Sequence, residues 1–162
     1  MTIDKIVSVV KGFGVSIVEI TGGEPLLQNQ TPLLCSEIMR LGYKVLVETN
    51  GSRDISTLPD GCIRIVDIKC PGSGNQDFYE NNISNLNRFD EVKFVISSIE
   101  DFNWALDKLT VNDLSNKCTV IFSPNTSTVN PSQLAQWIID RNVPVRLGIQ
   151  LHKVIWGEKR GV

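Results

Sequence analysis

Two glycines and a carboxylate follow the first apolar run of the chain. The segment Thr21–Pro25 reads Thr-Gly-Gly-Glu-Pro and comes directly after residues 15–20, which have the composition of a buried strand. Glycine adopts backbone angles closed to other residues and lets another molecule approach the main chain, while Pro25 stiffens the turn. Such a turn suits an amino-acid-like ligand, although it also fits an ordinary strand-to-helix turn with a solvated Glu24.

Polar stretches that contain glycine or proline follow three further apolar runs. They are residues 48–51 (Glu-Thr-Asn-Gly), 67–72 (Asp-Ile-Lys-Cys-Pro-Gly) and 123–126 (Ser-Pro-Asn-Thr). In parallel α/β folds, ligands bind at the carboxyl ends of the strands. The four turns are therefore predicted to line one ligand site.

The patterns that position these turns alternate between helix and strand. Helices are expected at about 3–12, 31–41, 99–110 and 131–140, and strands at 15–20, 45–47, 63–68, 92–96, 118–122 and 143–149. Thr31 and Asn130 are expected to cap the helices that follow them. Residues 70–90 are predicted to form an irregular loop with at most a short helix near 83–89. This alternation predicts an α/β fold with about six mostly parallel strands and right-handed crossovers.

Length and composition predict a single domain, 1–162. With 41% apolar and 21% charged residues, the chain resembles ordinary globular proteins. A formal charge of −2 gives no broad attraction to phosphate backbones, so nucleic acid is not an expected partner. No apolar stretch approaches the roughly 20 residues that cross a bilayer, and no signal-peptide pattern opens the sequence. A cytoplasmic protein without a membrane partner is expected.

The four cysteines are scattered along the chain. Cys35, Cys62, Cys70 and Cys118 form no Cys-x-x-Cys pair and no spacing typical of a metal site. Each is interpreted as a small buried apolar residue. We assign no metal-binding and no catalytic residue from the sequence.

Four ordered motifs resemble those of a known family. Residues 18–27, 47–51, 66–74 and 150–157 together resemble 7-carboxy-7-deazaguanine synthase, a radical S-adenosylmethionine lyase of queuosine biosynthesis. The resemblance covers nearly the whole chain and implies a partial (β/α)6 barrel. It also implies that the intact enzyme converts 6-carboxytetrahydropterin into 7-carboxy-7-deazaguanine, using S-adenosylmethionine, a 4Fe-4S cluster and Mg²⁺. The implied partners are a second copy of the chain, as a homodimer, and a reductant protein such as flavodoxin or ferredoxin.

The resemblance assigns the strand-end residues to two ligands. It implies that Gly22, Gly23 and Glu24 receive the ammonium group of S-adenosylmethionine through backbone carbonyls and a carboxylate. The other implied cofactor-binding residues are Glu48, Asn50, Asp67, Ile68, Lys69, Ser123, Pro124, Asn125 and Thr126. The implied substrate-binding residues are Thr21, Gln150 and His152, the single histidine. Structural roles stay open for several of them: Thr21 as a cap, Asn50 in a turn and Lys69 in a salt bridge.

The sequence departs from the family pattern in one respect. Family members hold the cluster on a Cys-x3-Cys-x2-Cys loop before the first helix, and the 162 residues contain no such loop. Iron-sulfur clusters require thiolate ligands, so we expect a chain that lacks the first strand and the cluster loop and is inactive alone. The alternatives are a cluster-free module that binds S-adenosylmethionine or a pterin without catalysis, and a doubly wound domain that uses these turns only as connections.

Overall fold

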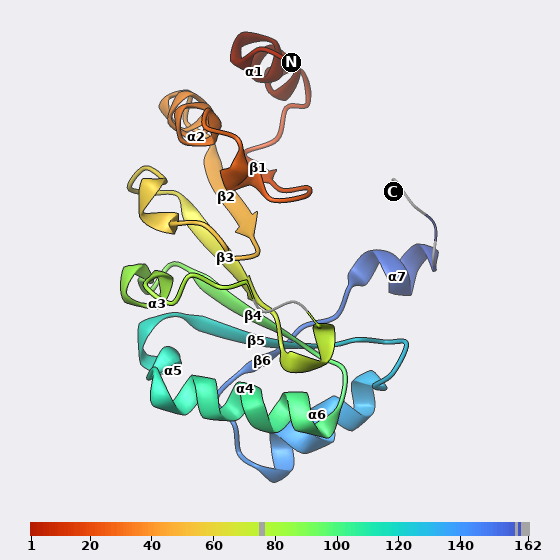
Figure 1. The fold of residues 1–162 in the computed structure, drawn as a ribbon. Coiled ribbons are helices and arrows are strands. Elements are labelled where there is room, and N and C mark those ends of the chain that lie inside the picture. The colour runs from red at the N-terminus through yellow and green to blue at the C-terminus, as the bar shows by residue number, and fades with distance from the viewer. Residues whose placement is uncertain (75–76, 158, 160–162) are drawn as a thin grey trace.

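Six parallel strands form one sheet, and their order in space follows their order in the chain (Figure 1). The structure is a computed structural model that describes residues 1–74, 77–157 and 159. Each strand pairs in parallel with the next, which confirms the predicted sheet. The strands are β1 (Ile17–Ile20), β2 (Lys44–Thr49), β3 (Ile63–Ile68), β4 (Glu91–Ile96), β5 (Thr119–Pro124) and β6 (Arg146–Leu147).

Helices connect the strands and contribute most of the remaining regular structure. The α-helices are α1 (Ile3–Gly12), α2 (Thr31–Arg40), α3 (Asn82–Asn85), α4 (Ile99–Val111), α5 (Leu114–Lys117), α6 (Pro131–Asp140) and α7 (Leu151–Trp156). Three short 3-10 helices are η1 (Pro25–Leu27), η2 (Ile55–Thr57) and η3 (Pro71–Ser73). Across the described ranges, no helix is both long enough and apolar enough to cross a bilayer.

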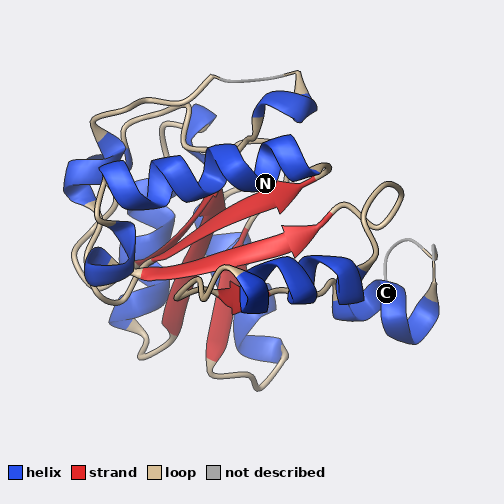
Figure 2. Ribbon diagram, turned by 90° about the horizontal axis from the view of Figure 1, so that it is seen from below, coloured by secondary structure: helices blue, strands red, loops and turns tan. Residues whose placement is uncertain are grey.

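One face of the sheet packs on the helices and forms the core. Helix α2 contacts β2, α4 contacts β4, and α5 and α6 contact β5, and Figure 2 shows helices lying over the strands. Side chains alternate between the two faces of a strand, so every second residue of β2, β4 and β5 is buried, as are Val66 and Ile68 in β3. Phe94, Phe102 and Phe122 stack edge to face there, with ring centroids 5.6 and 5.7 Å apart. The opposite face of the sheet is left accessible.

Element boundaries differ from the predictions where local chemistry ends an element. β6 covers only Arg146–Leu147 instead of 143–149, and Pro144 lacks the N–H group that would extend the ladder. The N-cap of α2 is Gln30 instead of Thr31, whose hydroxyl donates to the Pro25 carbonyl at 2.6 Å. Asn130 caps α6 as predicted, by accepting from the Ser132 N–H at 2.9 Å.

Three short helices also differ from expectation. The short helix of the 70–90 loop is α3, which begins and ends earlier than the predicted 83–89. Helices α5 and α7 were not predicted. With four and six residues, they are too short for an apolar period to be distinct from the surrounding sequence.

Candidate functional site

Polar side chains gather on the accessible face of the sheet, near the carboxyl ends of the strands. We define the open-face cluster as Thr21, Glu48, Asp67, Lys69 and Lys93. Glu48, Asp67 and Lys93 occupy alternate strand positions that point away from the helices and stay partly exposed. Asp67 lies beside Lys93 in the register of β3 and β4. Three of the predicted motifs are therefore brought together.

Glu48 links three parts of this face. The Lys93 ammonium forms an ion pair with Glu48 Oε1, reaching from β4 over β3 to β2. The Thr21 hydroxyl, at the end of β1, donates to Glu48 Oε2 at 3.2 Å. Burial alone would raise the pKa of Glu48, but the hydrogen bonds from Lys93 and Thr21 and the lysine charge outweigh it, so the pKa lies below its usual value.

Lys93 also stays charged in spite of its position. Burial would lower the pKa of Lys93, but the hydrogen bond to Glu48 and the charges of Asp67, Glu48 and Glu19 outweigh it, so the pKa is raised. Glu19 has the opposite balance: burial and the negative charge of Glu48 raise its pKa. Lys93 is thus the cation that three carboxylates share.

Asp67 has one oxygen that the protein does not satisfy. Its Oδ2 forms an ion pair with the Lys69 ammonium. Its Oδ1 is buried and has no hydrogen-bond partner among the described residues. An unsatisfied buried acceptor costs free energy, and a donor group of a bound ligand would remove that cost. A ligand N–H or O–H group that reached Oδ1 would satisfy it.

The Gly-Gly-Glu turn divides into an exposed backbone and a buried side chain. Gly22 and Gly23 are exposed and have φ angles of +97° and +55°, which disfavour other residues. Glu24 is 9% exposed, and its carboxylate already accepts three hydrogen bonds, from Leu26 N, Thr49 Oγ1 and Asn50 N. Its interpretation as a solvated acid is wrong.

Several other candidates make contacts within the protein. The side chains of Ile68 and Pro124 are buried and belong to the helix-covered side of their strands, so only their backbone is available to a ligand on the open face. Asn50 accepts from the Ser52 N–H at 2.9 Å in its own turn. Asn125 donates to Ser97 Oγ at 3.2 Å, and Thr126 is exposed next to it.

Two hollows flank the open-face cluster. One, of 510 Å³, lies over Thr21–Pro25 and the N-terminal end of α1. The other, of 450 Å³, is lined by Lys93, Ser123 and Gln150, among others. Thr21 lines the first hollow and Lys93 lines the second, and both side chains bond to Glu48. His152 lies in α7, and its side chain is outside the part of the chain that the structure describes.

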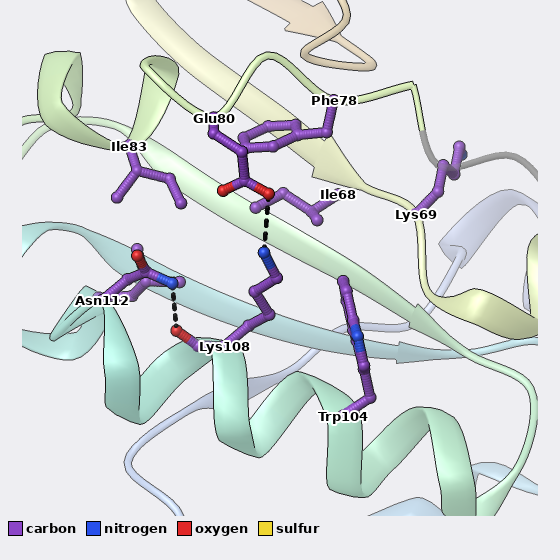
Figure 3. Close-up of a pocket in the computed structure, with 9 residues that line it drawn as sticks. Ile68, Lys69, Phe78, Glu80, Ile83, Trp104, Lys108 and Asn112 are labelled. Atoms are coloured by element: carbon purple, nitrogen blue, oxygen red, sulfur yellow. Dashed lines mark hydrogen bonds and ion pairs between the residues drawn. The ribbon is translucent and has the colours of Figure 1, made fainter.

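A further pocket lies on the opposite side of the sheet. It has a volume of 230 Å³, and Phe78, Trp104 and the ion pair between Glu80 and Lys108, 2.8 Å long, lie around it (Figure 3). Ile68, from the helix-covered side of β3, and Lys69, which follows the end of β3, also line it. Glu48 and Lys93 are not among its lining residues, so the pocket borders the open-face cluster at Lys69 alone and we do not include it in the site.

The described cysteines do not fit an iron-sulfur cluster. All four are buried, as predicted, and no three Cys, His, Asp or Glu residues of the described ranges converge as metal ligands. Burial raises the pKa of Cys70 to about 12 and that of Cys118 to about 11, whereas cluster ligands are thiolates.

Lys93 is the member of the site that sequence reasoning missed. It lies between the buried Val92 and Phe94, on the open side of β4, where a charged residue is ordinary for a strand with one buried face. Lys93 therefore looks like any exposed lysine of a strand in the sequence. Its partner in β2, one strand beyond the neighbouring β3, was not predictable from spacing.

Comparisons with known proteins find relatives for most of the chain. No protein-family model matches the sequence. The chain is 41% identical over 162 residues to the 7-carboxy-7-deazaguanine synthase of Koribacter versatilis (strain Ellin345), covering 90% of the chain and 72% of the relative. It is 37% identical over 168 residues to the enzyme of the same name from Chlorobaculum tepidum, covering 100% of the chain and 76% of that relative.

Solved structures share the fold. The crystal structure of QueE from Escherichia coli matches with a TM-score of 0.74 and 22% identity, covering 93% of the chain and 64% of QueE. Streptococcus suis SuiB bound to S-adenosylmethionine matches with a TM-score of 0.63 and 14% identity, covering 93% of the chain and 44% of SuiB. Given the identity to the curated relatives over most of both sequences, the chain belongs to the 7-carboxy-7-deazaguanine synthase family.

Proposed function

We propose that the open face binds S-adenosylmethionine and a pterin substrate for the conversion of 6-carboxytetrahydropterin into 7-carboxy-7-deazaguanine, with loss of ammonia, in queuosine biosynthesis. One observation carries the proposal: Thr21, Glu48 and Asp67, from three separate family motifs, meet at the strand ends of one sheet face. The unsatisfied Asp67 Oδ1 supports a ligand with hydrogen-bond donors.

The exposed backbone of Gly22 and Gly23 is proposed to receive the ammonium group of S-adenosylmethionine. The Glu24 carboxylate already accepts three hydrogen bonds within the protein. Its proposed contribution is therefore to hold this turn, and its remaining lone pair is proposed to accept from the ammonium group. Asp67, Lys69 and the turn 123–126 are proposed to hold the adenosyl group. When bound, S-adenosylmethionine supplies the radical chemistry of this family.

The substrate is proposed to lie against Thr21, Gln150 and His152. Gln150 lines the hollow next to Lys93 and Ser123, which places it on the same face as Glu48. Mg²⁺ belongs to the proposal as a family cofactor, and we assign it no ligand among these residues. Since the described cysteines do not fit a 4Fe-4S cluster, we derive no step of the reaction through one.

We further propose a cytoplasmic homodimer that receives electrons from a flavodoxin or ferredoxin. The support for association is the edge strand β1 and the segment before it, where Ile17 of the strand is 53% exposed and the preceding Phe13 and Val15 are 69% and 50% exposed. Unpaired edges with apolar side chains favour association. Sedimentation of the chain as a monomer at micromolar concentration would contradict the dimer.

A second candidate is a cluster-free module that binds S-adenosylmethionine or a pterin without catalysis. The observation that favours it is the lack of fit between the four buried cysteines and a cluster. The open face alone does not distinguish the two candidates, because both require a ligand at Asp67 and Glu48.

Two experiments test these candidates. Isothermal titration of the chain with S-adenosylmethionine should show binding that weakens in Asp67→Asn and is unchanged in Asp60→Asn, a matched change at an exposed loop. The chain is then joined to the part of the Koribacter versatilis relative outside the match. Formation of 5′-deoxyadenosine and 7-carboxy-7-deazaguanine supports the enzyme, whereas binding without either product supports the module.

A further inference from the structure

Lys93 lies among three carboxylates and bonds directly to one of them. Its ammonium pairs with Glu48, while Asp67 is its neighbour in the ladder and Glu19 acts on it through charge. The side chains of Lys93 and Glu48 are 23% and 31% exposed. A lysine in this position loses rotamer freedom and hydration, a cost that its ion pair with Glu48 offsets.

The pairing pattern suggests a role for Lys93. Asp67, the nearest carboxylate in register, is taken by Lys69. Lys93 instead reaches across β3 and holds Glu48 by Oε1 only. The second oxygen, Oε2, is left at the strand ends, where its protein partner is the Thr21 hydroxyl at 3.2 Å. A carboxylate oxygen has two lone pairs, so Oε2 keeps capacity for a donor from a ligand.

We propose that Lys93 is a positioning residue that holds Glu48 as an oriented carboxylate, ready to accept hydrogen bonds from N–H or O–H groups of the bound ligand. The ligand's identity rests on the proposed function, and S-adenosylmethionine is the probe. Lys93 acts through Glu48.

The charge on Lys93 matters as much as its reach. Without it, the Thr21 hydrogen bond and the charge of Lys69 would still favour the charged form of Glu48, whereas burial and the like charge of Glu19 would favour the protonated acid. A protonated carboxyl uses one oxygen as a donor and loses acceptor capacity. In a variant without the Lys93 charge, ligand affinity would then fall at pH values at which Glu48 becomes protonated in the variant but stays charged in the unaltered protein.

The first test measures the carboxylate itself, without ligand. Carbon-13 NMR of the glutamate side chains, assigned with Glu48→Gln, follows the titration of Glu48. In Lys93→Met the pKa of Glu48 should move upward, and in Lys93→Arg it should stay close to that of the unaltered protein. Arg146→Met removes another cation of the same face, paired with Glu91, and should leave the titration in place. An unchanged Glu48 titration in Lys93→Met overturns the proposal.

A reciprocal measurement covers the case in which Lys93→Met does not fold. In Glu48→Gln, nitrogen-15 NMR of the lysine ammonium groups should show the pKa of Lys93 moving downward, because its hydrogen-bonded partner has lost its charge. A Lys93 titration that is identical with and without the Glu48 charge overturns the link.

The second test adds the ligand. Lys93→Met should bind S-adenosylmethionine about tenfold more weakly than the unaltered chain at a pH below the Glu48 titration measured for that variant and recover as the pH rises through it, the loss expected when one charge-assisted hydrogen bond is missing. A loss that does not vary with pH indicates a purely structural role and overturns the proposal. If the unaltered chain does not bind S-adenosylmethionine while the NMR shifts are present, the proposed function fails and the link from Lys93 to Glu48 stands.

Discussion

The carboxylate of Glu24 accepts a hydrogen bond from the backbone N–H of Asn50, with 2.7 Å between Oε2 and N. Its other oxygen accepts from the Thr49 hydroxyl at 2.8 Å and the Leu26 N–H at 3.0 Å. The acid of the first turn therefore holds the end of β2 as well as its own turn. Two of the motifs that line the open face are joined by this one side chain.

Replacement of Glu24 should destabilise the fold. Glu24→Ala leaves the Asn50 N–H and the Thr49 hydroxyl without their partner, and we expect a loss of about 3 kcal/mol in the free energy of unfolding. Urea denaturation followed by circular dichroism measures it. Glu37→Ala, which removes an exposed acid paired with Arg40, is the control and should change stability by less than about 1 kcal/mol. Equal effects of the two substitutions would show that Glu24 has no structural role.

Stability should depend on pH with opposite signs at two neighbouring acids. The folded protein lowers the pKa of Glu48 below 4.5, so Glu48 contributes stability that is present above that pH and is lost as the pH falls through its folded pKa. The folded protein raises the pKa of Glu19, so its favourable contribution is present below 4.5 and is lost as the pH rises through its folded pKa.

Urea unfolding between pH 3 and pH 8 checks both signs. Glu48→Gln should be less stable than the unaltered chain at pH 7, and the difference should shrink toward pH 3. The stability of Glu19→Gln minus that of the unaltered chain should be more favourable at pH 7 than at pH 3, because the amide carries no charge to bury. Parallel pH profiles for the two variants would contradict the network around Lys93.

The sheet was predictable because its strands carry a simple signal. The predicted ranges 63–68 and 131–140 coincide with β3 and α6, since a β-branched run and a capped apolar stripe each depend on neighbouring residues in sequence. β6 was overestimated because Pro144 and the edge position limit pairing to two residues. Local patterns fail where the partner strand decides the boundary.

The location of the site was predictable from the sequence, but most of its side-chain contacts were not. Glycine and polar residues after apolar runs indicated the strand ends, where Thr21, Glu48 and Asp67 do meet. The contacts of Glu24 with β2 and of Lys93 with Glu48 span 26 and 45 residues, and depend on burial and on geometry across a strand. Neither quantity can be derived from the spacing of residues along the chain.

The aromatic cluster should dominate the stability of the helix-covered side. Phe102 is fully buried, and its ring centroid lies 5.7 Å from that of Phe122 and 5.6 Å from that of Trp137. Phe102→Ala should therefore cost about 3–5 kcal/mol, from lost burial and the cavity left behind. Phe89→Ala, at a ring that is 63% exposed, should cost less than about 1 kcal/mol. A small effect at Phe102 would mean that its ring does not pack on Phe122 and Trp137 as described.

Gly148 should be intolerant of a side chain because β6 approaches β5 closely at this point. A Cβ at Gly148 would lie 2.6 Å from Ile121 Cγ2 and close to the Ser123 hydroxyl, and the Gly148 N–H donates to the Phe122 carbonyl at 2.8 Å. Gly148→Ala must push β6 away or move both side chains, at a cost of about 1–3 kcal/mol. Gly12→Ala, where a Cβ meets no atom within 4 Å at the end of α1, should be neutral or stabilising by up to about 1 kcal/mol. Gly148 and Ser123 line the hollow beside Lys93, so Gly148→Ala should also weaken the binding of any ligand held there. An unaltered affinity in a destabilised variant would mean that the ligand binds elsewhere on the open face.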